Sequence, residues 1–173
     1  MFRFDSSGAS IALPEGPSRR IPRSRLAPFP EAVSAFLLWR SMPRVGVHPH
    51  GPLIVRRDEG AWRWCGGFAG MPAPTDAYLE ARVLPDRIPD DAIRLAMWAE
   101  AMDPAGVETA HLPLWLDHVR RRLPDDLMQQ IFGSRGPGAS AIARIWGISR
   151  QTVSRHLGAV PEIAEIGDVP DHE

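Results

Sequence analysis

Apolar and polar positions follow a regular helical pattern between residues 139 and 157, in the segment ASAIARIWGISRQTVSRHL. Apolar side chains recur there at the spacing of one helical face, and they continue beyond a glycine at position 147. These apolar positions are Ile142, Ala143, Trp146, Ile148, Val153 and Leu157. The pattern predicts two short helices that share an apolar core across a tight turn.

The residues between the two predicted helices are suited to such a turn. Gly147 stands where the first helix must end, and glycine adopts the left-handed backbone conformation that a Cβ disfavours. Ser149 follows at a position where its hydroxyl can cap the second helix. The sequence therefore predicts a helix-turn-helix over residues 139–157, with its second helix at 149–157.

The outward positions of the second predicted helix are hydrogen-bonding side chains almost throughout. Arginine reads guanine through two hydrogen bonds, glutamine reads adenine, and hydroxyl groups bond phosphate oxygens or base edges. No acidic residue occurs from position 127 to 161. We therefore expect this segment to bind double-stranded DNA; the alternative is a helical hairpin that only packs against the rest of the chain. The predicted DNA-binding residues are Ser140, Arg144, Ser149, Arg150, Gln151, Thr152, Ser154 and Arg155.

The first half of the chain has mixed patterns. Pro30 and Glu31 suit the start of a helix that runs to about residue 42. A β-hairpin is predicted over residues 52–65 around a turn at 58–60, and a further strand over residues 78–84. Together these elements predict a small α+β domain over residues 30–88. The apolar face of its helix is predicted to include Val33, Phe36 and Leu37, continuing to Arg40.

The second half of the chain has helical patterns only. Helices are predicted over residues 89–102, 113–123 and 124–132, and the first of them begins with acidic residues at the positive end of its dipole. The predicted fold class is therefore α+β, with an α+β domain followed by an all-helical domain over residues 89–160 that ends in the helix-turn-helix.

The two ends of the chain differ in charge. Residues 1–29 contain four prolines and a basic cluster, and we expect them to form an irregular basic arm that either contacts the DNA backbone or is solvated. Residues 161–173 are acidic and are predicted to be a tail that is either solvated or competes for the basic surface. The basic cluster of the arm is Arg19, Arg20, Arg23 and Arg25.

Composition excludes several classes of protein. The chain has 173 residues, of which 44% are apolar, so it can bury a sizeable core. Neither a membrane span nor the layout of a signal peptide occurs, so we expect a cytoplasmic protein. The single cysteine, Cys65, rules out an internal disulfide and a cysteine-based zinc site, and we interpret it as a buried structural residue.

The order of the elements and the segment PLIVRRDEGAWRWCGG at residues 52–67 together resemble a known family. They are similar to the ParB/sulfiredoxin-like fold joined to the helix-turn-helix of ParB-type partition proteins, over about residues 21–160. The ParB resemblance implies an arginine pair that binds nucleotide phosphate after the glycines, whereas Phe68 and Ala69 stand there. The sulfiredoxin resemblance implies a catalytic cysteine after the glycine pair, whereas Cys65 precedes Gly66.

No other pattern predicts a catalytic site. His48 and His50 could present two imidazoles to a metal, but no third ligand has a suitable spacing. Serine elbows, HExxH sequences and phosphate-binding loops are absent. We therefore expect neither catalytic residues, nor a metal, nor a cofactor.

These observations favour a sequence-specific DNA-binding protein that acts as a homodimer. The expected roles are transcription regulation, or partition or transfer of a bacterial plasmid or other mobile genetic element. One alternative is a protein-interaction factor, for example in conjugation, whose α+β half contacts a regulatory or transfer protein. A less favoured alternative is a ParB-like nuclease or nucleotide hydrolase.

Overall fold

The computed structural model of the chain describes residues 14, 16–46, 51–71, 77–133 and 136–158. Three predicted features lie outside these ranges: the first part of the arm, the pair His48 and His50, and the acidic tail at 161–173. The α+β fold class is confirmed by a five-stranded sheet and six helices within the described ranges.

The sheet is mixed and has the order β1-β5-β3-β4-β2. The outer strand β1 pairs antiparallel with β5, and the other outer strand, β2, pairs parallel with β4. The predicted hairpin is β3 and β4, which turn at Glu59 and Gly60, and β5 is the further strand that the alternation predicted. The strands are β1 (Ser18–Pro22), β2 (Leu26–Pro28), β3 (Leu53–Asp58), β4 (Ala61–Gly66) and β5 (Tyr78–Val83).

The prediction of an irregular arm over residues 1–29 is wrong for the second part of that range. Residues from Ser18 to Pro28 form both outer strands of the sheet, joined by the short 3-10 turn η1 (Arg23–Arg25). Ile21 is 1% exposed and pairs with Leu79 of β5. The prolines and arginines made these strands appear irregular in the sequence. Both residue types are nevertheless compatible with edge strands, because a proline at the end of such a strand leaves no hydrogen bond of the sheet unmade, and arginines suit an exposed edge.

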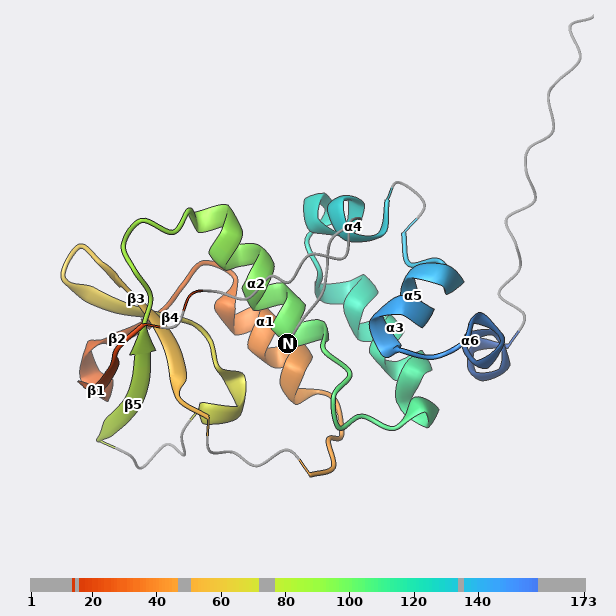
Figure 1. Cartoon of the computed structure of the whole chain (residues 1–173), viewed down its shortest axis with the longest axis horizontal. Coiled ribbons are helices and arrows are strands. Elements are labelled where there is room, and N and C mark those ends of the chain that lie inside the picture. The colour runs from red at the N-terminus through yellow and green to blue at the C-terminus, as the bar shows by residue number, and fades with distance from the viewer. Residues whose placement is uncertain (1–13, 15, 47–50, 72–76, 134–135, 159–173) are drawn as a thin grey trace, which may run out of the picture.

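The helices occur where the patterns predicted them. Helices α1 and α2 lie between the sheet at one end of the molecule and α3 to α6 at the other (Figure 1). The short 3-10 turns η2 (Phe68–Gly70) and η3 (Thr109–His111) lie in connections. The helices are α1 (Ala32–Arg40), α2 (Asp90–Met102), α3 (Leu112–Arg122), α4 (Asp125–Phe132), α5 (Ala139–Trp146) and α6 (Arg150–Leu157).

One hydrophobic core runs from the sheet to the helix-turn-helix. It includes Ile21 of β1, Trp98 of α2 and Val153 of α6. The boundary expected between residues 88 and 89 therefore does not separate two cores, because α2 packs against both α1 and β4. None of the helices in the described part of the chain is long and apolar enough to cross a membrane.

The face on which α1 packs differs from the predicted one. Ala32, Ala35 and Leu38 are fully buried, whereas Val33 and Leu37 are 49% and 42% exposed. Nearly every side chain of α1 is apolar, so periodicity alone cannot identify the buried face. The small alanines mark it instead, because helices that approach closely require small residues at the contact.

A polar network joins three helices. The Nε of Arg94 in α2 donates to Glu31 Oε2, just before α1, at 2.8 Å, and its Nη2 donates to Asp126 Oδ1 of α4 at 3.0 Å. The indole N–H of Trp98 donates to the same Glu31 oxygen at 2.7 Å. Glu31 has a φ of 65°, which L residues rarely adopt, so these contacts hold a strained backbone position.

Candidate nucleic-acid interface

Helix α5 is anchored by its apolar face, as the sequence predicted. Ile142 is 1% exposed, Ala143 7% and Trp146 9%. The ring of Trp146 meets that of Trp115 in α3 edge to face, with centroids 5.7 Å apart. The N–H of Trp115 in turn donates to the Met102 carbonyl at the end of α2 at 3.0 Å. The helix-turn-helix is therefore fixed to the rest of the fold through two tryptophans.

The turn after α5 has the geometry of a Schellman motif. Gly147 has φ 62° and ψ 29°, the left-handed conformation expected of it. Its N–H donates to the Arg144 carbonyl at 3.4 Å, and the N–H of Ile148 donates to the Ala143 carbonyl at 3.0 Å. These bonds satisfy carbonyls that the end of α5 leaves free, and they direct the chain sharply into α6.

Ser149 caps α6, as predicted. Its backbone is extended, and its Oγ accepts the Thr152 N–H at 3.0 Å. The hydroxyl groups of Ser149 and Thr152 also lie 2.9 Å apart and share a hydrogen bond. Both residues thus hold the first turn of the helix together, and Thr152 is partly buried rather than fully outward.

Four polar side chains form the exposed face of α6. Arg150, Gln151, Ser154 and Arg155 are all exposed, at spacings of one and four residues that place them on one side of the helix. Val153, on the opposite side, is 0% exposed and packs toward α3 and α5. Burial of Val153 therefore fixes which side chains α6 presents to solvent.

Helix α5 adds two polar side chains to this region. Ser140 and Arg144 are exposed and lie four residues apart, so they share one face of α5. Within the part of the chain that the structure describes, Arg144, Arg150 and Arg155 form no ion pair. Among the described residues, therefore, no carboxylate neutralises the charges of these three arginines.

The other candidate chemistry is not assembled by the described residues. Cys65 is 1% exposed, and burial raises the pKa of its thiol to about 12, which agrees with a structural role. No group of three metal-ligating side chains occurs among the residues the structure describes. The predicted histidine pair at 48 and 50 lies outside them.

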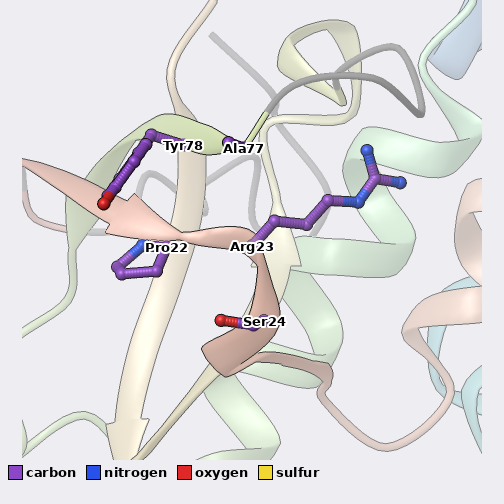
Figure 2. Close-up of a pocket in the computed structure, with 5 residues that line it drawn as sticks. All are labelled: Pro22, Arg23, Ser24, Ala77 and Tyr78. Carbon is purple, nitrogen blue, oxygen red and sulfur yellow. The ribbon is translucent and has the colours of Figure 1, made fainter.

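A hollow of about 640 Å³ lies where β1 ends and β5 begins. Figure 2 shows that the Tyr78 ring and the Arg23 side chain extend from it in different directions. The described lining contains no carboxylate, histidine or cysteine, so it brings together no acid, base and nucleophile. The lining residues are Pro22, Arg23, Ser24, Ala77 and Tyr78.

Comparisons with known proteins found solved structures that resemble the chain. No protein-family model and no curated protein matches the chain. The C-terminally truncated chromosome-partitioning protein ParB from Caulobacter crescentus, complexed to the centromeric parS site, is 14% identical with a TM-score of 0.37, over 80% of this chain and 70% of that one. The same protein complexed with CTP-gamma-S is 17% identical with a TM-score of 0.34, over 82% of this chain and 77% of that one. These TM-scores are low, so the function proposed for this chain rests on its own residues.

Proposed function

We propose that the chain binds double-stranded DNA and reads its sequence with α6. The observation that supports this most directly is the exposed face of α6, where two arginines, a glutamine and a serine stand on a capped helix held by a buried valine. A helix that only packed against the protein would not require four outward hydrogen-bonding residues. An α-helix fits the major groove, where base edges present a distinct pattern of donors and acceptors.

In this proposal the side chains divide into two groups. Arg150, Gln151 and one of Ser154 and Arg155 contact base edges, because the first turns of a recognition helix enter the groove most deeply. Ser140 and Arg144 of α5 bond phosphates, which orient the protein without reading sequence. The Thr152 hydroxyl is already bonded to Ser149, so it contributes a phosphate contact only by sharing that bond.

One helix-turn-helix makes few contacts, so we propose that the chain acts as a symmetric dimer on a palindromic or repeated site. The corresponding biological role is transcription regulation, or partition or transfer of a bacterial plasmid or integrative element. The sites that the protein occupies distinguish these roles: promoters for a regulator, and clustered repeats for partition.

The test is selection of bound genomic fragments, followed by fluorescence anisotropy on the best site across salt concentrations. Arg150→Ala and Arg155→Ala are each expected to weaken specific binding by on the order of 1–3 kcal/mol and to relax base preference. Arg121→Ala is the control, because Arg121 is an exposed helical arginine on α3, 74% exposed, that pairs with Asp117 and lies outside the proposed interface.

A discrete sequence motif that both α6 variants lose, and that Arg121→Ala retains, would support the proposal. Salt-sensitive binding without a motif, equally weakened by all three substitutions, would contradict sequence reading by α6. In that case the α+β half and a protein partner would become the next candidates to test.

A further inference from the structure

A glycine-rich turn after β4 is packed too tightly to accept side chains. Gly67 has a φ of +68°, and a Cβ there would lie 2.4 Å from the Pro52 carbonyl oxygen. A Cβ at Gly70 would lie 1.8 Å from the Gly51 carbonyl oxygen. The turn at residues 66–70 thus lies directly against the backbone that leads into β3, and its amide groups are held in fixed directions.

A carboxyl group from α2 occupies these amides. The Gly67 N–H donates to Glu100 Oε2 at 2.8 Å, and the Phe68 N–H donates to Glu100 Oε1 at 2.7 Å. A Cβ at Gly66 would approach the same Oε2 to 2.9 Å. Burial raises the pKa of Glu100, and the hydrogen bonds from Phe68 and Gly67 partly oppose that rise.

Two successive amides beside a left-handed residue form a concavity of the kind that binds phosphates. In this chain both oxygens of one side chain already satisfy both amides. The neighbouring cation is engaged in part: Arg44 Nη1 donates to the Ala105 carbonyl at 2.7 Å and the guanidinium lies 5.0 Å from the Trp39 ring centroid, while its Nη2 is buried without a partner among the described residues. An external phosphate would have to displace Glu100 to reach the amides.

We infer that Glu100 is the built-in ligand of the 66–70 turn, and that the turn therefore takes no external phosphate and binds no nucleoside triphosphate. The residues present do not fit the nucleotide site that the ParB resemblance implies, since a carboxyl group fills the amide pair and Phe68 and Ala69 supply no guanidinium. A consequence, which rests on the proposed function, is that DNA binding by this chain requires no nucleotide.

The first test is calorimetric titration of the full chain, without DNA, with CTP and with ATP in the presence of Mg²⁺. No saturable heat is expected up to millimolar nucleotide. Saturable nucleotide binding that persists in Arg150→Ala would overturn the inference. Binding that Arg150→Ala abolishes would instead take place at α6, and the inference that the turn binds no nucleotide would stand. Because DNA is absent, failure of the proposed DNA binding would not alter this result.

The second test removes the carboxyl group. Glu100→Ala is expected to lower the midpoint of thermal unfolding, and formate or acetate should raise that midpoint more than chloride at equal ionic strength. The wild-type chain should show a smaller difference between the salts, which reflects only their general effect on protein stability. An identical response of the two proteins would overturn the assignment of Glu100 as the ligand of the turn.

Glu100→Gln covers the case in which the alanine variant does not fold. Glutamine keeps the length of the side chain but turns one acceptor into a donor that faces an N–H group. Its midpoint should therefore fall below that of the wild-type chain. An unchanged midpoint would show that the two hydrogen bonds are dispensable and would overturn the inference.

Discussion

Single residues decide where α6 begins, and Ser149 is the clearest case. Its Oγ satisfies an amide of the first turn that would otherwise lack a partner within the helix. Ser149→Ala should therefore lower the free energy of unfolding by about 1 kcal/mol, measured by urea denaturation without DNA. Ser154→Ala is the matched control, because Ser154 is an exposed serine inside the same helix, and alanine is tolerated well there. Equal destabilisation by both substitutions would contradict the capping role.

Cys65 shows how burial alters the chemistry of one residue. Its Sγ lies 3.6 Å from the Ile54 carbonyl oxygen, and burial raises the pKa of the thiol to about 12. The reactive thiolate is therefore scarce even near the thiol's ordinary pKa. The native chain should not react with a disulfide reagent in mildly alkaline buffer, whereas the denatured chain should react with one equivalent of the reagent through its single thiol.

Ser154→Cys supplies the control for that measurement. It places a second thiol on the exposed face of α6, so the native variant should react once while Cys65 remains protected. Rapid reaction of the native wild-type chain would show that Cys65 is accessible, contrary to its burial.

At the scale of elements, the sequence predicted the helices, strands and turns for which the local residue types and the periodicity indicate the same structure. The α5–α6 turn is an example, because Gly147 and Ser149 determine it within a few residues. Strand β1 was missed since its pairing partner, β5, lies about sixty residues away along the chain, and local alternation does not report such a pairing. Glu100 was missed as a ligand for the same reason: its partners Gly67 and Phe68 are distant in sequence.

The candidate interface was predictable to a similar degree. The exposure of Arg150, Gln151, Ser154 and Arg155 follows from helical periodicity once Val153 is placed inward. The bond between the Ser149 and Thr152 hydroxyls does not follow from periodicity, because it depends on side-chain rotamers in the first turn. Nor does the edge-to-face contact of Trp115 with Trp146, which requires α3 and α5 to be docked.

At the scale of the whole molecule, the helical end is held to the sheet end by apolar packing and by the Arg94 network. Arg94 connects Glu31 before α1 with Asp126 of α4, and it lowers the pKa of Asp126 to about 2, chiefly through their hydrogen bond. The folded state therefore favours the ionised Asp126 more than the unfolded state does. Its stabilising contribution is present above the ordinary pKa of aspartate and is lost as the pH falls toward 2.

This sign gives a test of how α4 is attached. The wild-type chain should be more stable to heat than Asp126→Asn near neutral pH, and the difference in unfolding midpoint should shrink progressively below about pH 4. Asp125→Asn is the matched control, because Asp125 shares the negative position at the start of α4 but makes no hydrogen bond to Arg94 in the described structure. Asp126 is exposed, so the effect should be modest and should weaken with added salt. If both substitutions shift the midpoint equally at every pH, the helix dipole alone accounts for the contribution of Asp126 to stability. Packing of the apolar core, not Arg94, would then hold α4 in place.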